Sequence, residues 1–428
     1  MLSHKRRNEG YPRMSNRQVI VIGGGVIGAA CAYYLSSSGW QVTMVDRGQF
    51  GRGCSHANCG IICPSHLLPL AEPGAAWKAF KSLFQKNSPF SIKPRLDPAL
   101  WGWLWKFARR CNIPAMLESA HACQTLLLSS RELYEKLMAS EPLECEWEKR
   151  GLLFVFQRHA EMEEYAKTDR LLSESFGMPA VRYDESAVAR LEPALKPGLA
   201  GGWHYEHDAH LRPDKLLASW RRLLESRGVI IREQCEATGF QRDGNRARAI
   251  VTPNGELAAN AFVVAAGALT PLLAKHLGCR IPIQPGKGYS ITMPRPERCP
   301  AIPLLFPETR VAVTPMKSGY RLGSTMEFAG YDSSLNPSRL QLLKDGVRAY
   351  LQEPFCDPVQ EEWFGWRPMT YDGKPIIDRS PVMENVVIAA GHNMLGLSMS
   401  PGTGRLVAEL LSGDPPHLDP LPYSLRRF

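Results

Sequence analysis

The sequence of 428 residues predicts a protein of mixed α/β and α+β class with two interleaved domains. Three separated stretches, 16–100, 212–284 and 363–428, carry the strand and helix pattern of a Rossmann-like α/β domain. The stretches between them, 101–211 and 285–362, predict a second domain on a mixed or antiparallel sheet. Two domains also suit the length, because one ordinary hydrophobic core does not extend over so many residues.

The first stretch begins with a glycine-rich turn between a strand and a helix. An apolar strand at 18–22 leads into Gly23-Gly24-Gly25-Val26-Ile27-Gly28, and a helical pattern follows at 29–35. A second strand at 41–45 ends at Asp46. This order of strand, turn, helix, strand and acid is the fingerprint of a dinucleotide-binding unit.

Each residue type in this turn has a physical reason. Gly23 permits the tight turn, Gly25 lets the backbone approach a pyrophosphate, and Gly28 lets the helix pack close to the sheet. The unpaired N–H groups and the positive dipole end of the helix bind phosphates. Asp46 accepts a ribose hydroxyl. The turn therefore predicts an adenine dinucleotide, and a glycine-rich turn without a ligand is the alternative.

The remaining elements follow from hydrophobic periodicity and turn residues. In chain order we expect helices within 101–140, a strand at 151–156, helices at 160–176 and 213–227, a strand at 228–231, a hairpin of 248–252 with 255–257, a buried strand at 261–267, strand-like pieces at 310–314 and 320–323, a last strand at 386–390 and a closing helix at 404–411.

Charge and targeting signals limit the function classes. The net charge is +9, which favours anionic ligands, but the basic residues are scattered and we predict no nucleic-acid partner. Residues 19–35 carry no charge, but they are shorter than the roughly 20 residues of a membrane span and contain helix-breaking glycines, three of them consecutive. Residues 1–15 form a basic tail without an apolar core, so we expect a disordered tail, no signal peptide, and a start at Met1 or Met14. A cytoplasmic protein is predicted.

Cysteines and histidines do not predict a metal site. The eleven cysteines, without a secretory signal, favour free thiols. The spacing of Cys54, Cys59 and Cys63 differs from the usual iron–sulfur run, and no fourth cysteine is near. The stretch 203–210 has three histidines and two acidic residues, which could form a metal site, but we do not favour this interpretation.

The chain resembles the FAD-dependent D-amino-acid oxidase superfamily, and within it the bacterial D-amino-acid dehydrogenases. The resemblance covers residues 16–413 and rests on five stretches: VIGGGVIG (21–28), CSHANCG (54–60), GKGYSIT (286–292), GWRPMTYDGKP (365–375) and AAGHNMLG (389–396). It implies an FAD-binding domain made of three chain segments beside a substrate domain.

The resemblance also implies the residues that contact FAD. These positions are Gly23, Gly25, Val26, Ile27, Gly28, Asp46, Arg47, Ser55, Asn58, Gly60, Ile61, Ala266, Gly267, Gly391, His392, Leu395, Gly396, Leu397 and Ser398. Some related amine dehydrogenases attach FAD to a histidine in the loop that contains His56. There the histidine lies closer to the glycine than His56 lies to Gly60, so we expect non-covalent FAD.

Three residues are the candidates for contact with the substrate. Arg367 is implied as the clamp for a substrate carboxylate, because a guanidinium makes two parallel hydrogen bonds to it; a structural salt bridge is the alternative. Tyr289 either donates to that carboxylate or packs in the core. The helix N-terminus beside His392 suits the negative charge of a reduced flavin, and His392 itself is either part of that site or a turn residue.

The implied reaction is oxidative deamination of D-amino acids to 2-oxo acids and ammonia, by hydride transfer from Cα to flavin N5. For such a transfer the protein needs only to position the substrate and to complement its charge, so we expect no essential general base. Alternatives are a D-proline or cis-4-hydroxy-D-proline dehydrogenase, a glycine or sarcosine oxidase and, in a different class, a non-catalytic FAD-binding subunit of a dehydrogenase complex.

The resemblance to dehydrogenases implies a quinone or another respiratory acceptor. Two aromatic and basic stretches, 77–84 and 101–107, could contact a membrane surface, where quinones lie, or pack in the core. A peripheral membrane position and a partner subunit are thus further expectations.

Overall fold

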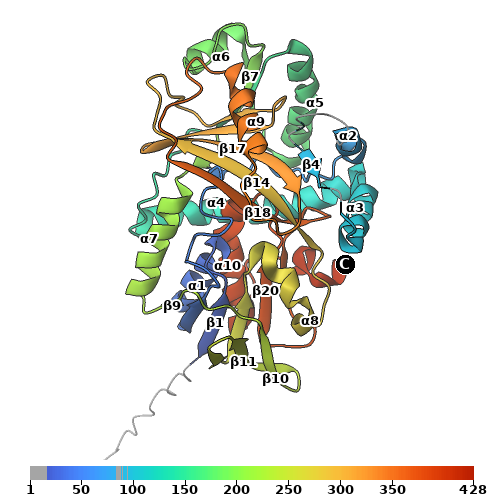
Figure 1. Cartoon of the computed structure of the whole chain (residues 1–428), viewed down its shortest axis with the longest axis vertical. Coiled ribbons are helices and arrows are strands. Elements are labelled where there is room, and N and C mark those ends of the chain that lie inside the picture. Colours follow the sequence, from blue (N-terminus) through green and yellow to red (C-terminus); the bar gives the residue numbers. More distant parts are fainter. Residues whose placement is uncertain (1–16, 83–87, 89, 94) are drawn as a thin grey trace, which may run out of the picture.

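Two sheets stacked along the long axis of the molecule determine the fold. The computed structural model describes residues 17–82, 88, 90–93 and 95–428, so the tail expected over 1–15 lies outside the described residues. In Figure 1 a large sheet with β14, β17 and β18 occupies the upper half, and a smaller sheet with β1 and β20 occupies the lower half. All eleven cysteines are free, as expected. In the described part of the chain no helix has the length and apolar character needed to cross a membrane.

The lower sheet has six strands drawn from all three expected segments. Its order is β19 (Ile376–Arg379), β20 (Val386–Ala390), β13 (Ala261–Val264), β1 (Gln18–Ile22), β2 (Gln41–Val45) and β9 (Ile230–Arg232). Only the pairing of β19 with β20 is antiparallel. β13 and β20 are completely buried, which explains their continuous apolar sequences.

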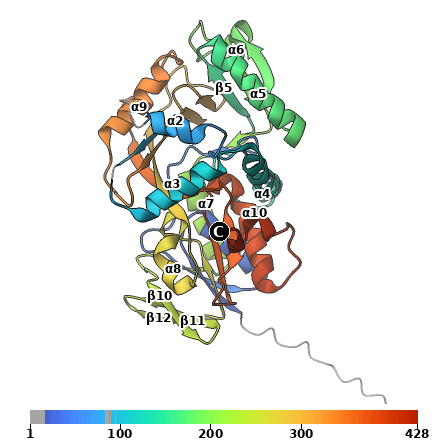
Figure 2. The ribbon, with the colours of Figure 1, turned by 90° about the vertical axis from the view of Figure 1, so that its right-hand side faces the viewer.

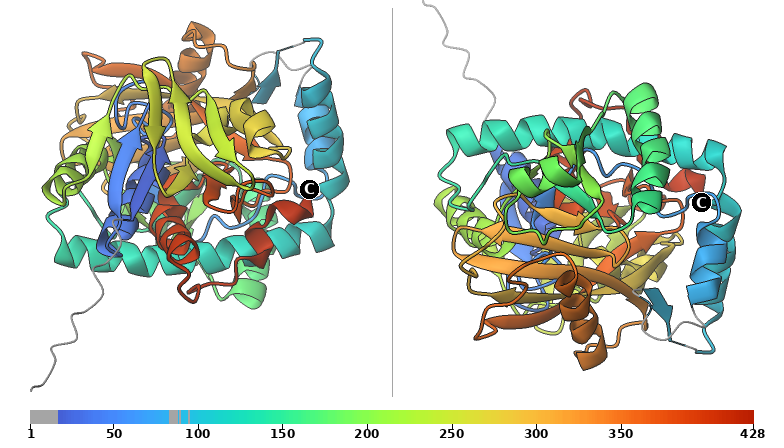
Figure 3. Two further views of the ribbon diagram at one scale, coloured as in Figure 1. Left: turned by 90° about the horizontal axis from the view of Figure 1, so that it is seen from below. Right: turned by 90° about the horizontal axis from the view of Figure 1, so that it is seen from above.

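One face of this sheet is covered by α1 (Val26–Ser37), then α10 (Gly396–Ser412), and then the 28-residue α4 (Ile113–Ser140). Figure 3 shows α4, in teal, lying beside α10, in red. The small residues of α10 permit close packing: a Cβ on Gly404 would lie 2.5 Å from Ala30 C, and one on Gly402 2.6 Å from Ser130 Oγ. The helix expected at 404–411 therefore begins earlier, at Gly396, because burial between two helices outweighs the low helix propensity of its glycines and Pro401.

The upper sheet has nine strands, mostly antiparallel. Its order is β18 (Glu361–Thr370), β14 (Ile283–Met293), β17 (Gly319–Phe328), β16 (Val311–Met316), β15 (Leu304–Phe306), β5 (Leu152–Phe156), β7 (Gly201–Tyr205) and β6 (Val181–Asp184), while β4 (Phe90–Ile92) pairs with the end of β17. The pairs β15–β5 and β17–β4 are parallel, so the sheet is mixed. α9 (Pro337–Arg348) and α6 (Glu185–Leu191) cover one face of it and share a core with Leu153 and Val155, whereas α5 (His159–Phe176) packs on the other face against Phe154 and Phe156. Figure 2 shows α9 and α5 well apart in the upper half of the molecule.

Two strands cross the boundaries that we expected between the domains. β4 and β18 both belong to the upper sheet, whereas the expected boundaries put 90–92 and 363–370 with the dinucleotide unit. β18 pairs with β14 along its whole length, and the chain then passes directly into β19 of the lower sheet. One continuous segment therefore connects the two sheets next to the candidate site.

Smaller elements complete the fold. They are β3 (Ile61–Ile62) paired with β8 (Ala209–His210), α2 (Ala75–Ser82), α3 (Pro98–Arg110), α7 (Pro213–Ser226), the three strands β10 (Gly239–Asp243), β11 (Arg246–Thr252) and β12 (Gly255–Ala258), η1 (Gly267–Leu273), α8 (Ala274–Leu277), η2 (Leu421–Tyr423) and η3 (Leu425–Arg427). The expected hairpin is thus β11–β12, and the strand expected at 261–267 ends at Val264 because η1 begins at Gly267.

Candidate functional site

A cavity of about 830 Å³ is lined by residues of both sheets. Asp46, Arg47 and Glu236 belong to its lining from the lower sheet and its loops, and Gly288, Trp363 and Arg367 from the upper sheet. Most of the predicted site residues line this one cavity: Gly23, Gly25, Val26, Ile27, Asp46, Arg47, Ser55, Asn58, Gly60, Ile61, Ala266, Gly267, Tyr289, Arg367, His392, Leu395, Gly396 and Leu397.

Three predicted cofactor residues, Gly28, Gly391 and Ser398, do not line the cavity. A Cβ on Gly28 would lie 1.9 Å from the carbonyl oxygen of Gly23, so this glycine permits close packing of α1, as its place in the fingerprint predicts. Gly391 has a φ of 74°, in the left-handed region. The Ser398 hydroxyl accepts a hydrogen bond from the Cys63 N–H at 3.2 Å. These three residues therefore lie outside the lining itself, next to residues that form it.

The glycine turn presents backbone N–H groups at the start of α1. Gly23 has a φ of 112°, and a Cβ there would lie 2.4 Å from the carbonyl oxygen of Ala265. Gly25 is the N-cap residue of α1 and, as a glycine, has no side chain that could cap the helix. The Asp46 carboxylate accepts hydrogen bonds from the Gly24 and Gly48 N–H groups, each at 2.7 Å. Since each carboxylate oxygen has a second lone pair, Asp46 can still accept a ribose hydroxyl.

The loop 53–60 forms a wall of the cavity next to this turn. The Ser55 hydroxyl accepts from the Val26 N–H at 3.1 Å, and the Asn58 side chain bonds the Gly60 N–H and the Ser55 carbonyl within the loop. His56 is not a lining residue, since its ring lies 2.8 Å from Glu361 Oε1 and also contacts Arg52. This placement supports the expectation that FAD is not attached through His56.

Arg367 is a cation that has no acidic partner in the described part of the chain. One of its Nη1–H groups donates to the Thr325 carbonyl at 2.6 Å, and the guanidinium packs on Gly288, where a Cβ would lie only 2.4 Å from Arg367 Cζ. No carboxylate of the described residues lies within 4.0 Å of it. Burial lowers the pKa of Arg367, because its charge is partly removed from water. A structural salt bridge, the alternative, is therefore not what the described residues form.

Tyr289 and His392 differ from Arg367. The Tyr289 hydroxyl donates to Glu327 Oε2 at 2.6 Å, so in this structure its proton is held by a carboxylate of the protein, and donation to a substrate carboxylate stays a prediction. Glu327 lies 38 residues away, and no sequence signal pairs the two. His392 is buried and lies 3.0 Å from the Thr403 hydroxyl. Burial lowers its pKa to about 3, so the ring is neutral near pH 7 and a weak proton acceptor.

An apolar wall that sequence reasoning did not find also lines the cavity. It consists of Leu68, Leu152, Phe154, Leu172 and Leu305. Four of them lie on β5, α5 and β15, and these elements either were expected or lie close to expected ones. Hydrophobic periodicity predicts such elements, but it does not tell which of their side chains contact a ligand. In the described residues no group of three or more His, Cys, Asp or Glu side chains could hold a metal ion.

Comparison with known proteins places this geometry in a family. Residues 18–410 match the family model described as FAD dependent oxidoreductase. The chain belongs to this family. The D-amino acid dehydrogenase of Granulibacter bethesdensis is 33% identical over 421 residues, covering 96% of this chain and 99% of that protein. The D-amino acid dehydrogenase of Methylobacterium nodulans is 34% identical over 413 residues, covering 94% and 96%.

Solved structures share the fold. Glycine oxidase from Geobacillus kaustophilus has a TM-score of 0.78 at 22% identity, and the alignment covers 96% of this chain and 99% of that one. L-proline dehydrogenase from P. horikoshii has a TM-score of 0.72 at 20% identity, covering 96% and 98%. The resemblance seen in the sequence motifs is thus confirmed at the level of family and fold.

FAD is the cofactor of this FAD-dependent oxidoreductase, and the residues present fit it. At the start of α1 the N-cap residue Gly25 has no side chain, and the Ser55 hydroxyl engages only the Val26 N–H. A Cβ on Gly23 or Gly60 would collide with a backbone carbonyl oxygen, so the backbone approaches this closely only with glycine at both positions. Asp46 suits a ribose and the N–H groups at Gly25 suit a pyrophosphate. The remaining cavity, toward Arg367, is left for the flavin ring and a substrate.

Proposed function

We propose that this oxidoreductase is a D-amino-acid dehydrogenase, in which Arg367 holds the substrate carboxylate. The observation that carries the proposal is the half-buried guanidinium, which lines the FAD cavity and has no acidic partner among the described residues. A cation that is partly removed from water without a counter-charge is costly, and a carboxylate ligand offsets that cost through paired hydrogen bonds. The relatives' names support the choice of D-amino acids.

The protein's own groups supply position rather than acid–base chemistry. When bound, FAD supplies the acceptor for the hydride of the substrate Cα–H bond. Arg367 fixes the carboxylate and thereby the direction of Cα–H. His392 is neutral and adds no second positive charge for that carboxylate, and the hydroxyl proton of Tyr289 is held by Glu327. The imino acid that leaves hydrolyses in water to a 2-oxo acid and ammonia.

The apolar wall favours a substrate with a side chain. Leu152, Phe154 and Leu172 offer an apolar surface that glycine and sarcosine do not use. D-Proline and cis-4-hydroxy-D-proline remain alternatives, because a ring also contacts such a wall. A non-catalytic subunit is less well supported, because it has no use for the Arg367 site.

Anaerobic mixing with amino acids tests the proposal. We expect D-alanine, D-methionine and D-proline to bleach the oxidised flavin absorption, L-alanine to leave it unchanged, and glycine and sarcosine to act far more slowly. The fastest substrate decides between open-chain and cyclic amines. If no D-amino acid bleaches the flavin while dithionite does, the dehydrogenase proposal is wrong and the subunit alternative gains support.

We infer further that α2 and α3 contact a membrane surface, where a quinone acceptor is available. Trp77, Trp101 and Trp105 are each more than half exposed on these two helices, while Leu100 and Trp103 face the core. Lys81 lies over the Trp77 ring at 5.2 Å and Arg109 over the Trp105 ring at 4.9 Å. Exposed indoles with cations suit the headgroup region of an anionic bilayer. Leu83 and Phe84 of the expected stretch lie outside the described residues.

A flotation assay tests this membrane contact. We expect the holoenzyme to float with vesicles that contain phosphatidylglycerol, and Trp101→Ala with Trp105→Ala to abolish flotation while flavin reduction by D-amino acids is unchanged. Leu421→Ala, which removes an exposed side chain outside these helices and outside the cavity lining, is the control. Flotation of the double variant at the wild-type level contradicts the proposed surface.

A further inference from the structure

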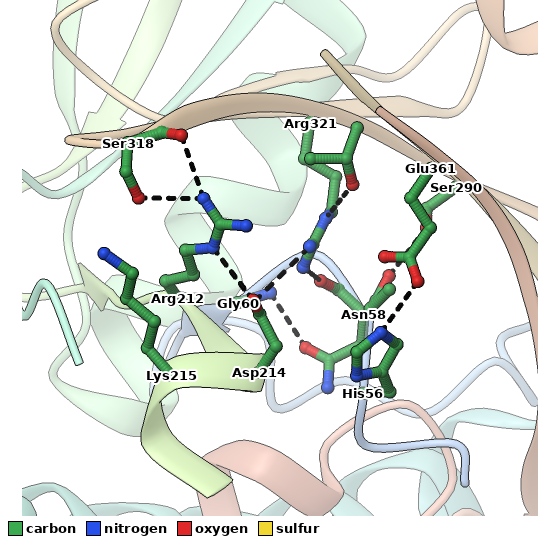
Figure 4. A network of polar contacts seen from close by, with 12 residues as sticks. His56, Asn58, Gly60, Arg212, Asp214, Lys215, Ser290, Ser318, Arg321 and Glu361 are labelled. Carbon is green, nitrogen blue, oxygen red and sulfur yellow. Dashed lines mark hydrogen bonds and ion pairs between the residues drawn. The ribbon is translucent and has the colours of Figure 1, made fainter. Parts of the chain in front are cut away.

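Three side chains of the upper sheet bind three consecutive carbonyls of the loop 53–60. The Ser290 hydroxyl donates to Ala57 O at 2.7 Å, Arg321 Nη1–H to Asn58 O at 2.9 Å, and the Thr314 hydroxyl to Cys59 O at 2.6 Å. The donors come from the neighbouring strands β14, β17 and β16. Figure 4 shows Arg321 and Ser290 with this loop. We call Ser290, Thr314 and Arg321 the carbonyl clamp.

The carbonyl clamp includes a buried positive charge, the guanidinium of Arg321. All three side chains are at most 1% exposed, and burial lowers the pKa of Arg321. Its Nε–H donates to the Thr292 hydroxyl at 2.9 Å, and Nη2 lies 3.6 Å from Asp214 Oδ1. Asp214 is shared with Arg212, so the nearest carboxylate compensates two guanidinium groups. Among the residues that the structure describes, none forms a hydrogen bond with Arg321 Nη2. Such an arrangement is a poor source of stability.

The loop that the clamp holds is the cavity wall. Ser55, Ala57, Asn58, Cys59 and Gly60 all line the FAD cavity. Arg321 and Thr314 do not line it, so they act on its contents only through the loop backbone. Because the carbonyls of residues 57–59 are held by the upper sheet, this part of the loop is ordered before a ligand binds, which lowers the entropy lost on binding.

We propose that Arg321 is a positioning residue, which with Ser290 and Thr314 holds residues 57–59 in the conformation that binds the flavin ring. The inference rests on FAD occupying this cavity and is independent of the substrate. Replacing Arg321 frees the Asn58 carbonyl and lets the loop relax. FAD affinity then falls, and the visible absorption of the bound flavin shifts, because the loop no longer packs on the ring in one conformation.

The test measures FAD binding by the apoprotein, without any substrate. We expect Arg321→Met to raise the dissociation constant of FAD about ten-fold or more, the size typical of losing one charge-assisted hydrogen bond. Arg321→Lys restores the charge next to Asp214 with fewer donors, so a partial rescue is expected. The control is Thr309→Val, which removes a hydroxyl that donates to the Gly346 carbonyl at 3.0 Å, outside the loop.

Two outcomes decide the proposal. A weaker FAD affinity and a shifted flavin spectrum in Arg321→Met, with both unchanged in Thr309→Val, support it. A lower melting temperature of the apoprotein with wild-type FAD affinity and spectrum overturns it and makes Arg321 a purely structural residue. If Arg321→Met does not fold, Thr314→Val decides in the same way, because it removes the donor to Cys59 O and lies outside the cavity lining. Since no substrate is present, failure here is distinct from failure of the dehydrogenase proposal.

Discussion

Replacement of Arg367 by alanine is expected to lower kcat/KM for D-amino acids by about 10- to 150-fold, chiefly through a higher KM. This range corresponds to about 1.5–3 kcal/mol, the usual value of hydrogen bonds to a charged group. The physical reason is that one N–H group of the Arg367 guanidinium donates to Thr325 O, while its remaining N–H groups can pair with a substrate carboxylate. Steady-state kinetics with D-alanine or D-methionine measure the effect.

Arg367→Lys is the matched control for charge. Lysine keeps the positive charge but lacks the planar pair of donors, so we expect an intermediate loss. FAD affinity of both variants should stay near that of the wild type. Kinetics of Arg367→Ala within a factor of about two of the wild type would show that the carboxylate is held elsewhere.

Replacement of Gly404 by valine is expected to destabilise the protein by about 1–3 kcal/mol or more, the range found for overpacked cores. A Cβ at this position would lie within 3.0 Å of the C, O and Cβ atoms of Ala30, so α1 and α10 must separate. Because α1 carries the phosphate-binding turn at its start, FAD affinity should fall as well. Thermal unfolding of the apoprotein and FAD titration measure the two effects.

Gly102→Ala is the control for this glycine. Gly102 also lies inside a helix, α3, but no atom lies within 4 Å of a Cβ placed there. Alanine is the better helix former, so the control should be neutral or up to about 1 kcal/mol more stable. If Gly404→Val melts at the wild-type temperature, the close packing of α1 on α10 has no energetic importance.

Local signals made the dinucleotide turn predictable from the sequence. Gly23 has a positive φ, and a Cβ at this position would collide with the carbonyl of Ala265, so only glycine fits there. Asp46 directly follows a strand. Both residues can therefore be recognised from a few neighbouring residues of the sequence. The clamp, the Glu327 partner of Tyr289 and the apolar wall have no such signature, because strand pairing brings them together from distant segments. β18 was misplaced for the same reason: only its pairing with β14 puts it in the upper sheet.

The order of the strands also bears on how the protein is made. β1 and β2 are synthesised first, but β1 pairs with β13 at residues 261–264, and β13 pairs with β20 at 386–390. The helix that covers α1 ends at Ser412. While the chain is being synthesised, β1 and β2 can pair with each other, but they and the apolar α1 lack β13 and α10 until late and are suited to protection by chaperones. The phosphate-binding turn belongs to the beginning of the chain, but it becomes a binding site only when nearly the last helix has emerged.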